Sequence, residues 1–235
     1  MQNLAPQVWY LDPDCADHGT LIDSLSASEL AQYRRFHFPA DAHRYLVAHA
    51  MVRHVLSRYA PVEPAEWLFS TTTRGKPKIA NPGLTSLQFN LTHTHSLVAC
   101  VISFDQECGI DAEHLHARNN PTGVAKRMFS PMEYAALMKL EDNEQLQYFY
   151  RHWTLREAYV KARGIGLSFP TNKIQLTVHS NTDIELCFDA SIKDQGENWM
   201  LRLWQIGAEH ILAMAVAQRN RQAAEPVLHR FDFSL

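Results

Sequence analysis

The sequence predicts an α+β protein made of two similar halves, an N-terminal half over residues 1–105 and a C-terminal half over residues 106–235. Short apolar runs typical of strands occur beside longer segments with apolar residues at helical spacing. The order strand, helices, strands occurs twice along the chain. The content of 46% hydrophobic and 20% charged residues is that of a globular protein with a sizeable core.

The N-terminal half opens with a strand over residues 8–11, which Asp12-Pro13 ends. Helices are expected over 26–37, which starts with a candidate Ser cap, and over 41–59, which Pro61 ends. Strands over 67–70 and 87–91 flank a loop that contains Arg74-Gly75-Lys76-Pro77. The continuous apolar run over 97–104 (LVACVISF) predicts a buried strand.

The C-terminal half opens with a short strand over 108–113. Helices are expected over 130–140, beginning at Ser130-Pro131, and over 144–163. Four strands, over 174–179, 184–188, 199–206 and 211–217, complete this half. The tail after Arg219 is predicted to be dispensable. No sequence repeat supports a duplication, which therefore rests on element order.

Charge and composition exclude several classes of protein. A net charge of −3 gives no overall field to attract nucleic acid or an anionic membrane, so any anion site must be local. The N-terminus lacks the features of a signal peptide, and no apolar run approaches the ~18 residues of a membrane span. Four scattered cysteines, without a CxxC pair, indicate reduced thiols and a cytoplasmic protein (Cys15, Cys100, Cys108, Cys187).

The segment Gly109-Ile110-Asp111-Ala112-Glu113 carries paired carboxylates. Residues two apart on a strand point to the same face, so Asp111 and Glu113 are predicted to lie side by side. Two hard oxygen ligands on one strand suit magnesium. The alternative is an exposed strand end with ordinary solvated acids, and the motif alone leaves both interpretations open.

A second charged group lies on the predicted helix over 144–163. Glu157 and Lys161 are one turn apart on one face, and Arg156 lies beside them. A carboxylate within a basic cluster can bind a metal while the cations hold phosphates. The alternative is a solvated salt bridge between Glu157 and Lys161. Trp153 is interpreted as a core residue in either case.

Three dispersed residues are candidate phosphate ligands: Arg44, Lys76 and His93. Arg offers a bidentate fork, Lys a point charge and His a hydrogen-bond donor. Each alone is more often a surface cation or a satisfied histidine. By strand periodicity His95 serves as well as His93.

Five motifs together resemble the surfactin-synthetase-activator type of 4′-phosphopantetheinyl transferase over residues 26 to 178. They are Asp41-Ala42-His43-Arg44, Arg74-Gly75-Lys76-Pro77, Phe89-Asn90-Leu91-Thr92-His93, Gly109-Ile110-Asp111-Ala112-Glu113 and Trp153-x-x-Arg156-Glu157-x-x-x-Lys161. Phe129-Ser130-Pro131-x-Glu133-Tyr134 and the turn Gly164-x-Gly166-Leu167-Ser168 also match. Any one motif is unspecific, whereas five motifs in the family's order and at its spacing are strong evidence for the resemblance.

The resemblance implies a pseudo-dimer of two similar α+β halves with the active site in the cleft between them. It implies transfer of the 4′-phosphopantetheine group of coenzyme A to a serine of an acyl or peptidyl carrier protein. Two halves in one chain would form a complete cleft, so a monomer is expected, with an oligomer as the alternative. Mg²⁺ would be bound by Asp111, Glu113 and Glu157, with Glu157 also a candidate base. Coenzyme A would be bound by the remaining motif residues, of which Lys161 and His93 also assist catalysis (Arg44, Arg74, Gly75, Lys76, Pro77, Thr92, His93, Arg156, Lys161).

The chain departs from the family at two positions. Arg156 stands where the family usually has Lys, and Arg cannot lose a proton, which puts any proton role there in doubt. Thr92 stands where Ser is common and keeps the hydroxyl group.

Two rival functions use similar residues. A non-catalytic module that binds coenzyme A or a carrier protein would keep the cations without needing three carboxylates. A metal-dependent phosphohydrolase would use an attacking water instead of a docked protein. For the carrier surface, Lys126-Arg127-Met128-Phe129, after the flexible segment 119–123, is a hypothesis. The alternative there is that Met128 and Phe129 are core and the two cations idle.

Overall fold

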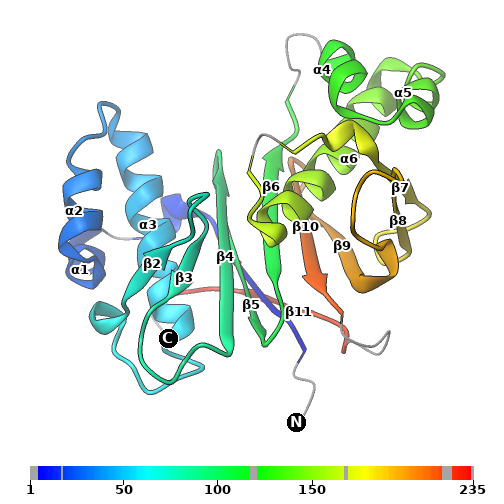
Figure 1. Cartoon of the computed structure of the whole chain (residues 1–235). Helices are drawn as coiled ribbons and strands as arrows, with labels where there is room; N and C mark the ends of the chain where they lie inside the picture. The colour runs from blue at the N-terminus through cyan, green and yellow to red at the C-terminus, as the bar shows by residue number, and fades with distance from the viewer. Residues whose placement is uncertain (1–4, 17, 117–120, 167–168, 219–223, 234–235) are drawn as a thin grey trace. The chain divides into compact units, whose positions relative to one another are not determined.

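The computed structural model describes residues 5–16, 18–116, 121–166, 169–218 and 224–233. These residues form two compact units (Figure 1). Unit 1 takes in the described residues of Met1–Asp105 and of Ala224–Leu235, and unit 2 those of Gln106–Ala223. The C-terminal segment therefore belongs to unit 1, although the sequence assigned it to the C-terminal half.

Unit 1 is built on a sheet whose strands follow the order β11-β1-β5-β4. Strand β1 runs antiparallel to β5 and parallel to β11, while β2 and β3 form a separate hairpin. Helix α3 packs against β4 and β5 (Figure 1). Its described elements are β1 (Gln7–Leu11), α1 (His18–Leu21), α2 (Ala27–Tyr33), α3 (Pro39–Leu56), β2 (Phe69–Thr71), β3 (Pro77–Ile79), β4 (Leu87–Thr94), β5 (Leu97–Phe104) and β11 (Val227–Arg230).

Local sequence accounts for the helices of unit 1. Ser26 caps α2 by accepting from the backbone N–H of Glu29, whose carboxylate accepts from Ser26 in return. Pro39 occupies the first turn of α3, where no N–H is required. Apolar side chains of α3, such as Met51, are fully buried in one core with residues of β5, such as Ile102.

Unit 2 has an antiparallel sheet in the order β6-β10-β9 and a separate β7–β8 hairpin. Helix α6 packs along β6 and β10 (Figure 1). The described elements are β6 (Cys108–His114), α4 (Pro121–Met128), α5 (Pro131–Leu137), α6 (Asp142–Arg163), β7 (Ile174–Val178), β8 (Ile184–Phe188), β9 (Trp199–Ile206) and β10 (His210–Ala217).

The helices of unit 2 also follow local rules. Ser130 and Glu133 form a capping box at the start of α5, with Pro131 at its first position. Gly164 ends α6 in the left-handed conformation, with φ of 59°, where an L side chain would be strained. The buried face of α6 includes Phe149 and Leu155, which pack in one core with the sheet.

The α+β class is confirmed, and so are most of the predicted helices and strands. Two segments differ from expectation. Pro77–Ile79 was interpreted as part of a loop but forms strand β3. The strand is stabilised by its backbone pairing with β2, which the local sequence does not indicate. Residues 121–123, interpreted as flexible, begin helix α4 with Pro121 in its first turn. Leu167-Ser168, predicted to belong to a turn that matches the family, and residues 119–120, predicted to be flexible, lie outside the described residues.

The prediction that the tail after Arg219 is dispensable is wrong for its described part, residues 224–233. Strand β11 pairs with β1, and His229 stacks on Trp9 with ring centroids 4.2 Å apart. Phe231 is buried in the core of unit 1. Local sequence does not signal this pairing, because the partner strand lies at the other end of the chain. No described helix is long and apolar enough to cross a membrane.

Candidate active site

Three residues of β6 face helix α6. Gly109, Asp111 and Glu113 alternate along the strand and so share one face. A Cβ atom at Gly109 would lie 2.1 Å from the carbonyl oxygen of Ala158 and 2.3 Å from the amide nitrogen of Ala162. Glycine therefore allows β6 to approach the helix backbone closely. The two carboxylates that follow are held against α6.

Asp111 is buried, with 6% of its surface exposed. Its Oδ1 atom accepts a hydrogen bond of 2.6 Å from the Nζ atom of Lys161, and the two groups form an ion pair. Burial raises the pKa of Asp111 to about 6; the charge of Glu113 adds to the rise and the ammonium group of Lys161 opposes it. The alternative of an ordinary solvated acid is thus excluded for Asp111.

The facing surface of α6 carries the other predicted residues. The indole Nε1 of Trp153 donates a hydrogen bond of 2.8 Å to Oε1 of Glu113. Trp153, Glu157 and Lys161 follow at intervals of four residues and share a helix face. Because Trp153 reaches Glu113 and Lys161 reaches Asp111, this face is turned toward β6, with Glu157 between the two contacts. The three carboxylates thus come from two surfaces that face each other.

These side chains suit a hard divalent cation in donor type, since carboxylate oxygens are the ligands that magnesium prefers. Asp111 already holds one cation, the ammonium group of Lys161. As the described side chains stand, no group of three or more His, Cys, Asp or Glu residues is arranged to hold a metal ion. The donor atoms of these residues therefore fit the metal chemically.

Arg156, predicted to bind phosphate, lies in the core of unit 2 with 1% of its surface exposed. Its guanidinium group forms an ion pair with Glu133 and donates hydrogen bonds of 3.1 Å to the backbone carbonyl groups of His152 and Ile174. Consecutive helix residues point about 100° apart, so Arg156 does not share the face of Glu157. We therefore correct the prediction that Arg156 binds phosphate: its hydrogen bonds go to the interior of unit 2.

The predicted cations Arg44 and Lys76 belong to unit 1. Arg44 lies in the N-terminal part of α3 and forms an ion pair with Asp41. Its side chain is 24% exposed. A phosphate at Arg44 would compete with the carboxylate of Asp41 for the guanidinium group.

The turn Arg74-Gly75-Lys76 joins β2 to β3, which begins at Pro77. Gly75 has φ of 86°, and its N–H donates to the carbonyl oxygen of Thr72 at 2.9 Å. The N–H of Lys76 donates to Oγ1 of Thr72 at 3.0 Å. Backbone hydrogen bonds thus fix the turn, with Arg74 exposed and Lys76 half-buried.

Thr92 and His93 were predicted to bind phosphate together. Both lie on β4, where neighbouring residues point to opposite faces. Thr92 is buried, with 5% of its surface exposed, whereas His93 is exposed. The strand therefore directs their side chains to different surroundings. His95 is also exposed, next to Ser96 in the turn that leads to β5.

Sequence reasoning missed the role of two residues. Trp153 was interpreted as core, yet it donates a hydrogen bond to Glu113. Its position four residues before Glu157 was the available signal. Gly109 was quoted as part of a motif without a role, although its lack of a side chain brings β6 against α6. The structure thus brings together Asp111, Glu113, Trp153, Glu157 and Lys161 within unit 2.

Comparison with known proteins assigns both parts of the chain to one group. Residues 9–104 match the model of the 4′-phosphopantetheinyl transferase N-terminal domain, and residues 107–215 match that of the 4′-phosphopantetheinyl transferase superfamily.

Curated relatives agree with this assignment. The 4′-phosphopantetheinyl transferase HetI of Nostoc is 34% identical over 78% of this chain and 84% of its own length. The transferase Sfp of Bacillus subtilis is 31% identical over 82% of each chain. The L-aminoadipate-semialdehyde dehydrogenase-phosphopantetheinyl transferase of Mus musculus is 25% identical over 95% of this chain and 77% of its own.

Proposed function

We propose that this chain, which belongs to the 4′-phosphopantetheinyl transferase superfamily, transfers phosphopantetheine from coenzyme A to a serine of a carrier protein. We also propose that Asp111, Glu113 and Glu157 bind the Mg²⁺ that this reaction uses. The observation that supports this most directly is the buried carboxylate of Asp111, which already holds a cationic group beside α6. A buried acid whose pKa is shifted by burial and by a specific charged partner is a candidate for a functional site.

The proposed reaction forms one bond and breaks one. The serine oxygen of the carrier attacks the phosphorus that carries the pantetheine arm, and the bond from that phosphorus to the 3′,5′-adenosine diphosphate breaks. Magnesium, when bound, neutralises negative charge on the pyrophosphate. Glu157 takes the serine proton, directly or through a water molecule. Lys161 stabilises the leaving diphosphate.

The cations of unit 1 are assigned to the coenzyme. Arg44 and Lys76 are proposed to bind its phosphate groups and so to contribute affinity that is equal in the ground and transition states. His93, exposed at the end of β4, is proposed to donate to a phosphate oxygen. Thr92, Arg74, Gly75 and Pro77 are proposed to contribute through the local backbone and turn.

We further propose that one chain is a complete enzyme and that it acts in the cytoplasm. Both sets of site residues occur in the same chain, so a monomer supplies the cations and the carboxylates. None of the four cysteines, all of which lie in the described part, forms a disulfide, which agrees with a reducing compartment.

One assay tests the proposal against its rivals. Purified protein, coenzyme A, magnesium and an apo carrier protein are incubated, and the intact mass of the carrier is measured. We expect the carrier to gain one phosphopantetheine group, and to gain none when EDTA is added. Release of 3′,5′-adenosine diphosphate without a carrier would indicate a phosphohydrolase. Binding of coenzyme A without either product would indicate a binding module.

A further inference from the structure

The two units contain the same arrangement of interacting polar side chains. Each has a Ser-x-x-Glu capping box on a short helix and a Tyr-x-x-x-His-x-x-x-Arg series on its long helix. In each, the Glu pairs with the Arg, and the His stacks on the Tyr. We call each set a clamp: clamp 1 is Ser26, Glu29, Tyr45, His49 and Arg53, and clamp 2 is Ser130, Glu133, Tyr148, His152 and Arg156.

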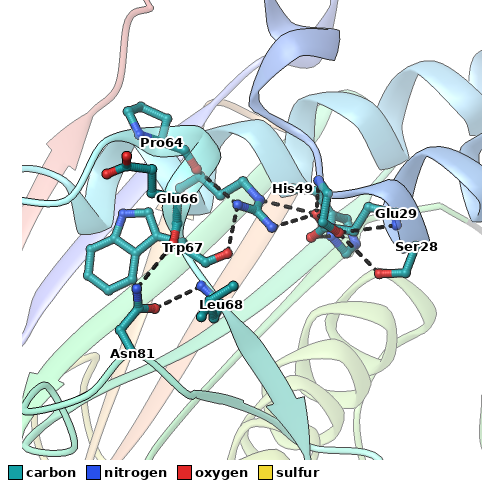
Figure 2. Close-up of polar contacts among 10 residues, drawn as sticks. Ser28, Glu29, His49, Pro64, Glu66, Trp67, Leu68 and Asn81 are labelled. Carbon is teal, nitrogen blue, oxygen red and sulfur yellow. Dashed lines mark hydrogen bonds and ion pairs between the residues drawn. The ribbon is translucent and has the colours of Figure 1, made fainter.

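Clamp 1 holds α3 to α2 and to the chain before β2. The guanidinium group of Arg53 donates to Oε2 of Glu29 at 2.7 Å and to the carbonyl oxygens of Pro64 and Trp67 at 2.9 and 3.0 Å. His49 contacts the other oxygen of Glu29 at 2.9 Å. In Figure 2, Glu29 and His49 lie at one end of this network, and Pro64 and Trp67 at the other.

Clamp 2 holds α6 to α5 and to β7. Arg156 pairs with Glu133 and donates to the carbonyl oxygen of Ile174, the first residue of β7. The second oxygen of Glu133 accepts the backbone N–H of Leu176 at 2.8 Å. Both Arg156 and Glu133 are nearly inaccessible, with 1% and 3% of their side chains exposed. One buried ion pair thus connects three elements.

The position of clamp 2 along α6 links it to the candidate site. Arg156 directly precedes Glu157, and His152 directly precedes Trp153. The clamp residues fix one side of the helix while Trp153, Glu157 and Lys161 occupy the side turned toward β6. A helix held by a fixed fork of hydrogen bonds cannot rotate without leaving a buried charge unpaired.

We propose that Arg156, through Glu133, is a positioning residue that sets the rotation of α6 and thereby aims Trp153, Glu157 and Lys161 at β6. The proposal rests on the proposed function for its effect on catalysis, although its structural part does not. Arg156 is assigned no contact with the coenzyme or the metal. Clamp 1 provides the matched control, because Arg53 makes the same kind of network in the unit that lacks the carboxylates.

The test compares Arg156→Lys with Arg53→Lys. Lysine keeps the charge for Glu133 or Glu29 but cannot reproduce the planar fork. For Arg156→Lys we expect kcat to fall about 10- to 100-fold, because small displacements of catalytic groups have effects of this size, with the KM for coenzyme A within about threefold. Arg53→Lys should leave kcat within about threefold of the parent.

A second readout needs no activity. The indole N–H of Trp153 donates to Glu113, so its ¹H–¹⁵N signal, assigned with Trp153→Phe, reports the facing of α6 and β6. We expect Arg156→Lys to shift this signal and Arg53→Lys to leave it unchanged. If the protein transferred no phosphopantetheine at all, the proposed function would fail while this measurement would still decide the positioning role.

A milder pair of variants covers the case in which Arg156→Lys does not fold. Glu133→Gln keeps an oxygen to accept the N–H of Leu176 and removes the charge that Arg156 pairs with, and Glu29→Gln is its counterpart. Glu133→Gln is expected to shift the Trp153 signal as Arg156→Lys does. An unchanged signal with a raised KM for coenzyme A and an unchanged kcat would overturn the proposal in favour of phosphate binding. Equal losses of kcat in the two units would overturn it in favour of general destabilisation.

Discussion

Units 1 and 2 share a framework but differ in how the long helix meets the sheet. In both, a helix packs on a three-stranded antiparallel arrangement, β1-β5-β4 in unit 1 and β6-β10-β9 in unit 2. In unit 1 the interface between α3 and the sheet is apolar. In unit 2 one edge of the corresponding interface carries carboxylates and a lysine.

The correspondence extends to single positions. Counting from the two clamp arginines, Lys161 in unit 2 corresponds to Arg58 in unit 1. Arg58 lies 4.8 Å from the ring centroid of Trp9 on β1, whereas Lys161 pairs with Asp111 on β6. An aromatic residue in one unit thus occupies the place of an acid in the other. The two interfaces therefore differ in a few exchanged side chains, while the helix–sheet framework is common to both units.

The strongest effect is expected from removing the charge that distinguishes unit 2. Asp111→Asn keeps the size of the side chain but loses the anionic ligand, so we expect transfer to fall at least about 1,000-fold with the fold retained. Intact-mass assays over a magnesium titration measure this. Asp189→Asn, a change at an exposed carboxylate of the same unit, is the control. Near-normal activity of Asp111→Asn would disprove the metal assignment.

The second expected effect tests the close approach of strand and helix. Gly109→Ala places a Cβ atom 2.1 Å from backbone of α6, so β6 must move away and transfer should fall about 100-fold with a clear loss of thermal stability. Gly83→Ala in unit 1 is the control. Gly83 has φ of 79° and open space within 4 Å of where a Cβ atom would lie, so only about 1 kcal/mol of backbone strain is expected. Similar losses for both variants would refute the packing argument.

The third prediction concerns acid. Burial, and next the charge of Arg156, lower the pKa of His152 from 6.5 to about 4. His152 is therefore neutral in the folded protein, whereas the unfolded chain takes up a proton as the pH falls below about 6.5. The free energy of unfolding therefore falls as the pH drops from 6.5 to 4. The pKa difference of about 2.5 between the unfolded and folded states corresponds to a loss of roughly 3 kcal/mol.

Clamp 1 should respond at lower pH. Burial favours a higher pKa for Glu29, but hydrogen bonds from His49 and Ser26 and the charge of Arg53 outweigh it and lower the pKa to about 2. Its stabilising effect is present above pH 4.5 and is lost as the pH falls toward 2.

Other groups also titrate between pH 7 and 5: the lowered pKa values of His54 and His229 weaken unit 1, and the raised pKa of Asp111 opposes the loss in unit 2. The test therefore compares the parent with His152→Gln: amide hydrogen exchange in unit 2, corrected for intrinsic rates, should lose more protection between pH 7 and 5 in the parent. An equal loss in both proteins would contradict the prediction.

The fourth prediction concerns coenzyme affinity in unit 1. Arg44→Ala and Lys76→Ala should raise the KM for coenzyme A about 10-fold and leave kcat within about twofold, because they remove uniform binding. Dephospho-coenzyme A, which lacks the 3′-phosphate, should be less sensitive to whichever residue contacts that group. If a substitution raised the KM for both substrates equally, the substituted residue would not contact the 3′-phosphate.

The weakest effect is expected at the carrier surface on α4. Lys126 and Arg127 are exposed there, while Phe129, just after the helix, is buried. Lys126→Glu with Arg127→Glu should lower kcat/KM for an acidic carrier a few-fold at low salt and reduce its salt dependence. Arg34→Glu with Arg35→Glu, an exposed pair in unit 1, is the control. If both pairs had equal effects, overall charge would be the cause and not a docking surface.

Much of the fold could be predicted because local signals were strong. The run at 97–104 matches β5, and Ser130-Pro131 marks the start of α5. Strand β11 could not be predicted, since its order depends on pairing with β1 at the other end of the chain. The repeated clamps were also missed, because five residues shared between halves of different sequence stand out only when their contacts are known.

The candidate site was predicted in part. Strand and helix periodicity correctly placed Asp111 with Glu113, and Glu157 with Lys161, on shared faces. Helix periodicity does not show whether Arg156 points into the core of unit 2 or toward the candidate site. Arg156 was therefore predicted to bind phosphate, whereas its side chain pairs with Glu133 on α5. Thr92 and His93 were likewise grouped by their motif, whereas strand β4 directs the two side chains to opposite faces.

The return of the chain to β1 affects the order in which the molecule can be completed during synthesis. Gln7 pairs with Val227, a separation of 227 − 7 = 220 residues. A ribosome has therefore synthesised every strand of unit 2 before the last strand of unit 1 exists. Domains generally fold in the order of synthesis, but here the earlier unit must wait for Phe231 to close its core. Nascent chains that end before residue 227 and are followed by a linker long enough to clear the ribosomal exit tunnel should thus show a protease-resistant unit 2, with the first unit open to cleavage.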